Sequence, residues 1–189
     1  MGKGVSHVDS GLSTLPAIQF SNWHHWRHRD RVQENRLPGV YLLARFTDNR
    51  VPPQGADPLA EDIVYIGETS ASLAARWRQF HRDAFEGIPS HAGGANYRNT
   101  RYPMPWRALH VAALTSSPLH WRAWAGLSED RLTQLGVSRD ESEELKRGIE
   151  YGPAWKKGDL NRAWIKYVER KLILDFVLKW GRLPRCNKE

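Results

Sequence analysis

Residues 62–81, DIVYIGETSASLAARWRQFH, contain the pattern on which the fold depends. Residues 63–66 form an apolar run long enough for a buried or half-buried strand, and Gly67 ends it. Side-chain oxygens that can cap a helix follow directly at Thr69, Ser70 and Ser72. The stretch therefore predicts a strand, a glycine turn and a helix.

The helix that follows has one apolar stripe and one arginine beside it. The stripe has the i, i+4, i+7 and i+11 spacing of Leu73, Trp77, Phe80 and Ala84. Arg76 lies about 60° from Leu73 around an ideal helix. A strand, a turn and a helix flanked by arginine can present a tyrosine and a guanidinium to one ligand.

Composition favours a polyanionic partner. The 189 residues suit one domain, or one domain with a helical insertion. Lys and Arg number 28 against 21 Asp and Glu, which gives a net charge of +7. Nucleic acid is the first candidate partner and an acidic membrane surface the second, with a merely basic surface as the plain alternative. The 9 Trp residues suit base stacking, although Trp is more often a core residue.

Several classes of protein are excluded by what the sequence lacks. The single cysteine, Cys186, rules out an internal disulfide and a cysteine-rich zinc site. No apolar run approaches the roughly 20 residues of a membrane span, and the first residues lack a signal peptide's apolar region. We therefore expect a cytoplasmic protein with no membrane partner.

The first 37 residues are expected to form a basic N-terminal arm. Residues 1–20 show no periodicity, whereas residues 21–36 combine histidines, tryptophans and arginines. His24 and His28 have the i, i+4 spacing of metal ligands on a helix. Because no third ligand completes that set, a basic helix that lies on the fold or on phosphates is favoured over a metal site.

Three strands are expected in the following domain, residues 38–189. Residues 40–46, 63–66 and 107–114 have strand-like apolar patterns, and the first two are expected to pair antiparallel. The segments between them, residues 47–61 and 86–105, are rich in proline and glycine and are expected to be loops.

The second half of the chain is expected to be helical. Residues 117–158 contain capping and punctuation signals for short helices, and we expect a helical insertion there. A helix-turn-helix reader is a weaker alternative to plain packing in this insertion. A longer helix is expected over residues 160–180, with an apolar face made by Ile165, Val168, Leu172 and Phe176.

Glu169 interrupts the apolar face of that last helix. It falls about 40° from Ile165 around an ideal helix, so its carboxylate is expected among apolar side chains. An unpaired buried carboxylate is costly, so Glu169 needs a partner. Either an arginine such as Arg76 or a bound cation would serve, and a purely structural ion pair remains an alternative.

Taken together, these features resemble the GIY-YIG nuclease superfamily. The first signature is Gly39-Val40-Tyr41 and the second is Tyr65-Ile66-Gly67. The family's arginine, metal-binding glutamate and late asparagine match Arg76, Glu169 and Asn187. The resemblance covers roughly residues 38–115 and 160–187. It implies metal-dependent hydrolysis of phosphodiester bonds in nucleic acid.

The residue chemistry agrees with that implication. A scissile phosphate gains negative charge during in-line attack and needs a fixed cation and a metal. Arg76 can grip phosphate oxygens bidentately, and Glu169 is an oxygen ligand of the kind that Mg²⁺, or Mn²⁺ in its place, accepts. Tyr41 and Tyr65 are expected on one side of the sheet. By resemblance Tyr41 is the candidate base, and Tyr65 orients water or phosphate.

The sequence departs from the family in two places. Twenty-three residues separate Tyr41 from Tyr65, so residues 47–61 are an insertion relative to the family's usual gap. Family members often carry a histidine where this chain has Phe80. His81 is adjacent but projects about 140° away from Arg76, and His91 resembles a second histidine of some members. His91 is therefore favoured over His81.

We thus predict an α+β protein with a small three-stranded antiparallel sheet, flanking helices and a helical insertion. The expected function is a magnesium-dependent endonuclease, with DNA favoured over RNA. The alternative is an inactive nucleic-acid-binding module of the same fold. Arg76 and basic residues of the 91–101 segment are expected to line one groove with the N-terminal arm. The recognition sequence, the restriction, homing or repair role and the oligomeric state are left open.

Overall fold

The structure is a computed structural model that describes residues 18–47, 50–102, 105–116 and 154–188. Its four strands are β1 (His24–His25), β2 (Gly39–Arg45), β3 (Ile63–Thr69) and β4 (Leu109–Thr115). Its helices are the 3₁₀ helix η1 (Trp26–Arg31) and the α-helices α1 (Leu73–Glu86), α2 (Ala92–Asn99) and α6 (Ala154–Trp180). The predicted α+β class is confirmed.

The sheet is antiparallel, with strand order β1-β4-β2-β3. The three predicted strands are confirmed, and β2 lies between β3 and β4 as their common partner. Tyr41 at the centre of β2 faces Gly67 of β3 on one side and Ala113 of β4 on the other. The predicted count of three strands was wrong because β1 adds a fourth strand at the outer edge of β4.

Residues 18–37 are part of the fold rather than a separate arm. We expected a basic helix over residues 21–36, and the structure has β1 and the six-residue η1 there instead. Trp23 and Trp26 are both buried, but in the two cores on opposite faces of the sheet. One apolar stripe of a helix cannot place side chains in both cores. A short strand at the edge of the sheet can place one tryptophan in each core. Residues 1–17 lie outside the described residues.

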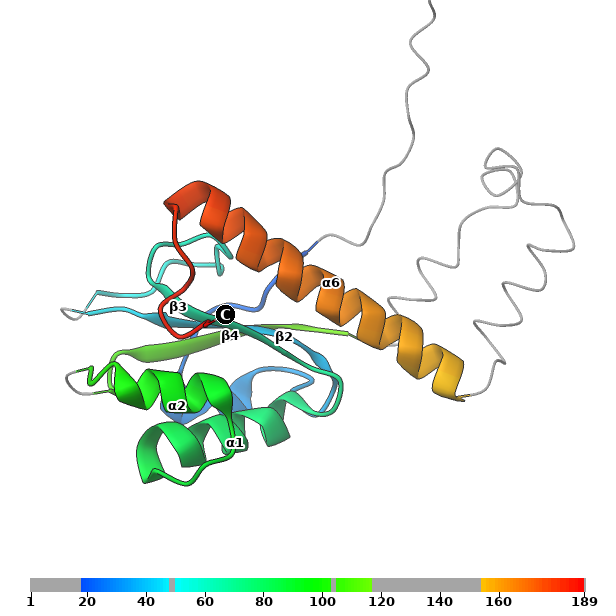
Figure 1. The fold of residues 1–189 in the computed structure, drawn as a ribbon, viewed down its shortest axis with the longest axis horizontal. Coiled ribbons are helices and arrows are strands. Elements are labelled where there is room, and N and C mark those ends of the chain that lie inside the picture. The colour runs from blue at the N-terminus through cyan, green and yellow to red at the C-terminus, as the bar shows by residue number, and fades with distance from the viewer. Residues whose placement is uncertain (1–17, 48–49, 103–104, 117–153, 189) are drawn as a thin grey trace, which may run out of the picture.

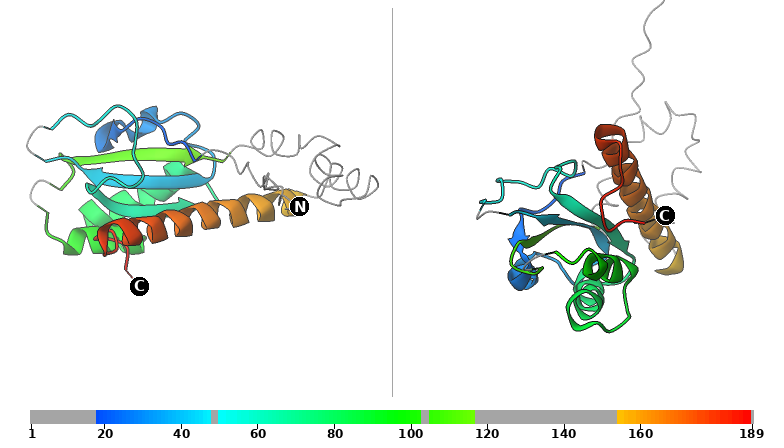
Figure 2. Two further views of the ribbon diagram at one scale, coloured as in Figure 1. Left: turned by 90° about the horizontal axis from the view of Figure 1, so that it is seen from above. Right: turned by 60° about the vertical axis from the view of Figure 1, so that its left-hand side comes forward.

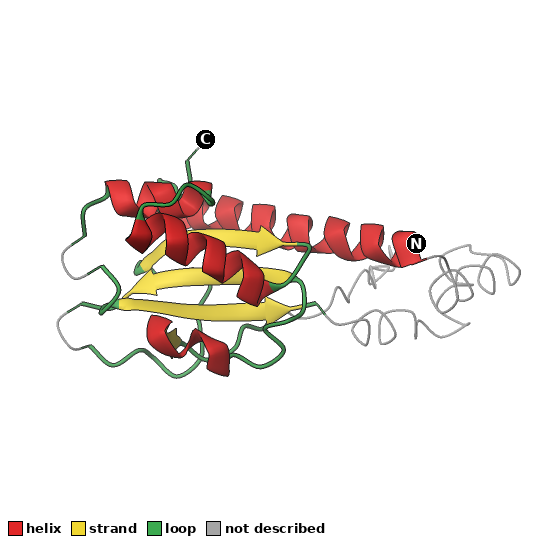
Figure 3. Cartoon of the chain, turned by 90° about the horizontal axis from the view of Figure 1, so that it is seen from below, coloured by secondary structure: helices red, strands yellow, loops and turns green. Residues whose placement is uncertain are grey.

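The sheet separates two apolar cores. Helices α1 and α2 cover one face, and α6 lies across the other (Figure 1). The two further views agree with this layering (Figure 2), and seen from below a helix crosses in front of the strands on the α1 side (Figure 3). The side chains of β2 alternate between these cores, with Tyr41 and Leu43 on the α1 side and Val40 and Leu42 on the α6 side.

Helix α1 forms as its sequence pattern predicts. Ser72 caps it by accepting a hydrogen bond from the Ala75 amide at 3.2 Å, and all four residues of the predicted stripe are buried. Gly87 ends the helix with a φ of 74°, a conformation that favours glycine. The expectation that residues 86–105 form only a loop was wrong, because α2 occupies the middle of that segment.

Helix α6 carries the predicted apolar face, and its four members, Ile165, Val168, Leu172 and Phe176, are buried. The helix begins at Ala154 and not near residue 160, so the last residues of the predicted insertion, 154–158, belong to it. Residues 117–153 of the insertion lie outside the described residues. Among the residues that are described, no helix has both the length and the apolarity needed to cross a bilayer.

The segment after α6 turns back along the open edge of β3. Gly181 ends the helix with a φ of 65°. The Cys186 amide then donates to the Val64 carbonyl at 2.8 Å. The side chain of Asn187 accepts from the Ile66 amide at 2.8 Å and donates to the Ile66 carbonyl at 2.7 Å. These bonds satisfy backbone groups that an edge strand otherwise leaves unpaired.

Candidate active site

The two signature tyrosines lie side by side on the α1 face of the sheet. Tyr41 of β2 and Tyr65 of β3 have ring centroids 5.8 Å apart. Two glycines make room for them. A Cβ at Gly67 would collide with the Tyr65 ring and come within 2.9 Å of Tyr41 Cζ, and a Cβ at Gly93 would come within 2.5 Å of Tyr65 Cε2. Any larger residue at either position would displace the tyrosine pair.

His91 joins the tyrosines from the start of α2. Its Nε2 lies 2.9 Å from the Tyr41 hydroxyl, and its Nδ1 accepts a hydrogen bond from the Gly94 amide at 3.1 Å. Burial, aided by the charge of Arg76, lowers the pKa of His91 to about 4, so the ring is neutral at pH 7. Because Nδ1 accepts, the ring proton is on Nε2 and is donated to Tyr41.

A buried carboxylate on α1 fixes His91 in place. Oδ2 of Asp83 accepts hydrogen bonds from the backbone amides of Ser90 at 2.9 Å and His91 at 3.0 Å. Arg98 pairs with this carboxylate, with Nη1 3.1 Å from Oδ1. Asp83 was not among the predicted site residues. Asp83 follows Phe80 by three residues on the buried side of α1, so the argument applied to Glu169 could have found it.

The tyrosine hydroxyls are held as neutral phenols. Burial raises the pKa of Tyr41 well above 10, the neighbouring Tyr65 raises it further, and the charge and hydrogen bond of Arg76 oppose the rise. The side chain of Tyr41 is completely buried, whereas Tyr65 is 9% exposed. Burial also raises the pKa of Tyr65, and the charge of Arg76 opposes that rise. Because Tyr65 is the more exposed of the two, it lies between Tyr41 and the surface.

Arg76 lies one turn into α1 and carries the positive charge of this cluster. Its Nη1 donates to the Gln79 side chain at 3.2 Å, while its buried Nε has no hydrogen-bond partner in the described part of the chain. Its charge lowers the pKa values of both tyrosines. Arg76 thus keeps donor capacity for an external anion.

Glu169 reaches the same cluster from α6. Burial, and then the charge of Glu68, raise the pKa of Glu169 to about 7, and Arg170, Arg76 and Lys166 oppose the rise. Glu169 forms no ion pair with Arg76 among the ion pairs of the described residues, so the predicted arginine partner is a neighbour rather than a contact. Glu68 was not among the predicted site residues; it pairs with Val40 and so lies on the α6 side of the sheet.

These two carboxylates are candidate ligands for a divalent cation. Glu68 Oε2 is buried and has no hydrogen-bond partner among the described residues. Two carboxylates that repel each other, one with an unsatisfied oxygen, are stabilised when a cation lies between them. Within the described residues no three metal-ligating side chains of the His, Cys, Asp and Glu types form a group. Mg²⁺ needs only one or two carboxylates, with waters completing its octahedron.

Asn187 is close to the site, but its amide faces the backbone of β3. Both its oxygen and its nitrogen bond to Ile66, the residue between Tyr65 and Gly67. Asn187 therefore positions the strand that carries Tyr65. A role as a group that touches the reacting atoms stays a prediction.

The structure does not bring the other histidines to this cluster. His81 lies on the other side of α1, where its Nδ1 accepts from Trp26 Nε1 at 3.2 Å and its Nε2 lies 3.5 Å from Glu86. His24 is in β1 and His28 in η1, so they do not share the helix that their spacing suggested. Phe80 fills the core against the His91 ring, with centroids 5.4 Å apart.

Two hollows open beside the cluster. One of about 570 Å³ is lined by Tyr65, Glu169 and Asn187 together with residues of α2 and α6. A smaller one of about 230 Å³ is lined by Glu68, Arg76 and the start of α1. Of the predicted groove, Arg98 is paired with Asp83 and does not line the hollow that contains Arg76. Residues 1–17 of the predicted arm lie outside the described residues.

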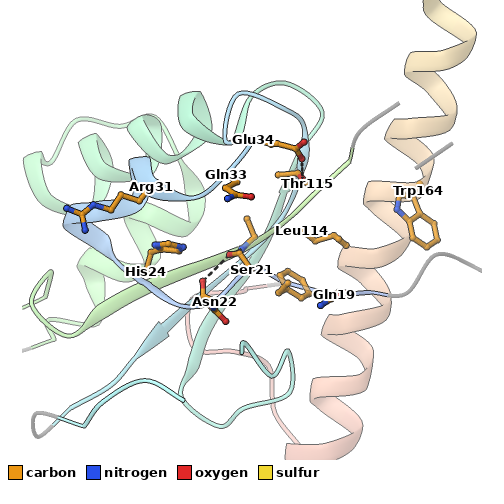
Figure 4. Close-up of a pocket in the computed structure, with 12 residues that line it drawn as sticks. Gln19, Ser21, Asn22, His24, Arg31, Gln33, Glu34, Leu114, Thr115 and Trp164 are labelled. Atoms are coloured by element: carbon orange, nitrogen blue, oxygen red, sulfur yellow. Dashed lines mark hydrogen bonds between the residues drawn. The ribbon is translucent and has the colours of Figure 1, made fainter. Parts of the chain in front are cut away.

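A third hollow, of about 690 Å³, lies along the outer edge of β4. Polar side chains line it, and Glu34 accepts a hydrogen bond from Thr115 there at 2.8 Å (Figure 4). None of the predicted site residues borders this hollow. The candidate active site is therefore the cluster at β3.

Comparison with known proteins adds no relative: no family model, no curated protein and no solved structure matches this chain.

Proposed function

We propose that this protein is a metal-dependent endonuclease that hydrolyses phosphodiester bonds in nucleic acid, with DNA as the favoured substrate. The proposal rests mainly on one observation. Tyr41, Tyr65, Arg76 and Glu169 come from four different elements and interact electrostatically as one cluster. Two buried polar atoms at this cluster have no hydrogen-bond partner among the described residues. The donor, Arg76 Nε, suits a phosphate oxygen, and the acceptor, Glu68 Oε2, suits a cation.

Arg76 is the group that holds the scissile phosphate. Its guanidinium can donate two parallel hydrogen bonds to phosphate oxygens, and its position beside Glu68 in one hollow brings anion and cation sites together. Charge that develops on the phosphate during attack is then stabilised by a fixed positive group.

Glu169 and Glu68 are the residues that would hold Mg²⁺ or Mn²⁺. The cation, when bound, supplies Lewis-acid stabilisation of the phosphate oxygens. Without it, burial and then repulsion by Glu68 keep a proton on Glu169 up to about pH 7. Metal binding must displace that proton, so metal affinity is expected to increase with pH.

His91 and the two tyrosines form a row of polar groups that leads to the surface. His91 donates to Tyr41, so the Tyr41 hydroxyl proton is available to the neighbouring Tyr65, which is the more exposed of the two. In this row of groups Tyr65 contacts water or phosphate, and Tyr41 and His91 fix the orientation of the Tyr65 hydroxyl. Tyr41 can act as the base only if its raised pKa falls when the substrate and the cation bind.

Cleavage of mixed DNA and RNA substrates tests the function directly. The parent is expected to cut with Mg²⁺ or Mn²⁺ and not with a chelator. Arg76→Gln is expected to reduce kcat by roughly a hundredfold or more, the usual cost of removing one stabilising donor. Arg82→Gln on the exposed side of α1 is the matched control and is expected to cut at the parental rate.

The alternative function is a binding module that keeps the fold without cleavage. Two observations favour it: Phe80 replaces a histidine of the family, and the Tyr41 side chain is completely buried with a raised pKa. Metal-independent binding of nucleic acid, with no product under any metal, would select this alternative over the nuclease.

A further inference from the structure

A groove rich in arginine lies between η1, the connection to β2, and α1. Its volume is about 960 Å³. Four arginines from three segments line it, and together they define what we name the arginine groove: Arg27, Arg29, Arg36 and Arg78. Asp30 is the carboxylate among its lining residues, and its charge acts on Arg29.

Three of these arginines carry charge that the described structure does not neutralise. Arg27, Arg36 and Arg78 are exposed, and none makes an ion pair with a carboxylate in the described part of the chain. Like charges gathered in a concave surface repel one another and raise the local concentration of anions. The groove is therefore suited to an extended anionic partner.

The groove is also held in a fixed shape. The guanidinium of Arg27 lies 3.8 Å from the centroid of the Trp106 ring, which restricts its orientation. The backbone on both sides of Arg36 is tied to the start of α1. The Ala74 amide donates to the Asn35 carbonyl at 2.8 Å, and the Leu73 amide donates to the Leu37 carbonyl at 3.0 Å. Such preorganisation lowers the entropy cost of binding.

The arginine groove meets the candidate active site at the start of α1. Ser72 borders both the groove and the hollow that contains Arg76. Arg76 and Arg78 project about 200° apart around a helix roughly 10–12 Å across. The two arginines therefore suit different phosphates of a strand that passes the start of α1.

We propose that the arginine groove binds the phosphate backbone of DNA beside the bond presented to Arg76, with Arg27, Arg36 and Arg78 each contacting a phosphate. This inference extends the proposed nuclease function to the position of the substrate, and it assigns a role to the segment 26–36 that lies outside the predicted nuclease core. A concave path is matched to a single polymer backbone, whereas an acidic membrane would present a flat surface.

The test measures binding without cleavage. Fluorescence anisotropy of a labelled 20-base-pair duplex is followed in EDTA across NaCl concentrations for the parent and for the triple variant Arg27→Gln, Arg36→Gln, Arg78→Gln. The control triple variant Arg50→Gln, Arg162→Gln, Arg182→Gln removes the same charge elsewhere. Circular dichroism melting checks that both variants fold.

Loss of three phosphate contacts is expected to reduce the slope of log K against log salt by roughly 2 to 3 and the affinity by at least about tenfold. The control is expected to keep a slope within one unit of the parent's. Equal slopes for the two triple variants would overturn the inference. The inference would also be overturned if the parent did not bind the duplex at low salt but did bind vesicles of acidic lipid.

The result is independent of catalysis. A groove-dependent slope with no cleavage under any metal would support the groove and refute the nuclease. Cleavage that survives the groove variant with unchanged binding would support the nuclease and refute the groove.

Discussion

Glu169→Gln gives the sharpest test of the site, because it removes one charge and keeps the shape of the side chain. The pKa of Glu169 is raised from 4.5 to about 7. The folded state therefore binds more protons than the unfolded chain between these values, and the stability of the parent falls as the pH rises through that range. At about 1.4 kcal/mol per pKa unit, the cost above pH 7 is at most about 3 kcal/mol, and solvent screening reduces it.

The variant is expected to be more stable than the parent at pH 8 in EDTA, by about 1 to 3 kcal/mol. For a chain of this length the difference corresponds to an increase in Tm of up to roughly 10 °C. At pH 5 the difference is expected to shrink below about 1 kcal/mol, because folded Glu169 is then protonated in the parent. The assay is thermal unfolding followed by circular dichroism at both pH values.

His91 makes the pH profile more informative. Its pKa is lowered from 6.5 to about 4, so its contribution to stability is lost as the pH falls through that range. In the parent this gain with rising pH offsets the loss from Glu169 between about pH 4.5 and 6.5. The parent's profile is expected to be nearly flat there, and the variant's stability is expected to rise with pH.

Added Mn²⁺ is expected to raise the Tm of the parent and leave that of Glu169→Gln unchanged, since only the parent binds the ion tightly. Glu61→Gln, at a largely exposed carboxylate, is the control and is expected to follow the parent. A variant that melts below the parent at pH 8 in EDTA would refute the reasoning. That result would mean that Glu169 belongs to a stabilising ion pair.

Three other changes test the surroundings of the site. His91→Ala is expected to reduce kcat roughly a hundredfold, because it releases Tyr41, whereas His81→Ala is expected to leave kcat unchanged. The reverse ranking of the two variants in a single-turnover assay would contradict the assignment of His91 to the site. Glu68→Gln is expected to weaken Mn²⁺ binding by about tenfold in an electron paramagnetic resonance titration, and unchanged affinity would remove Glu68 from the cation site. Asn187→Ala leaves the buried Ile66 amide unpaired and is expected to lower the free energy of unfolding by about 1 to 3 kcal/mol in a urea titration. A negligible decrease would show that the Asn187 side chain does not stabilise the edge of β3.

The elements predicted from the sequence are those in which local pattern and tertiary packing agree. The stripe of α1 and the apolar face of α6 each bury one side against one core, so their periodicity is direct evidence, and the 63–66 run is continuous because both of its faces are buried. Over residues 21–36 the periodicity of apolar residues predicted the wrong element, because Trp23 and Trp26 are buried on opposite faces of the sheet. Helix α2 was missed because Gly93 and Gly94, which its close packing requires, are residues that usually indicate a loop.

The residues of the candidate site could be predicted where the chemistry of a single side chain identifies them. They could not be predicted where their role depends on the geometry of the backbone. Arg76 and Glu169 could be selected because a guanidinium and a carboxylate beside apolar stripes need partners. Asp83 was open to the same reasoning, but its bonds to the Ser90 and His91 amides depend on the turn that follows α1, and Glu68 faces α6 only because of the strand register. These contacts, unlike the buried position of Asp83, do not follow from local spacing.

The order in which the chain is made has a consequence for when the site can exist. All four strands precede Glu169, so a ribosome finishes the sheet, Arg76 and both tyrosines before it makes the carboxylate of α6. The open edge of β3 is covered later still, when Cys186 and Asn187 arrive. Under the proposed function, a nascent chain thus carries Arg76 before Glu169 exists. Such a chain would bind a polynucleotide before it is able to cut it.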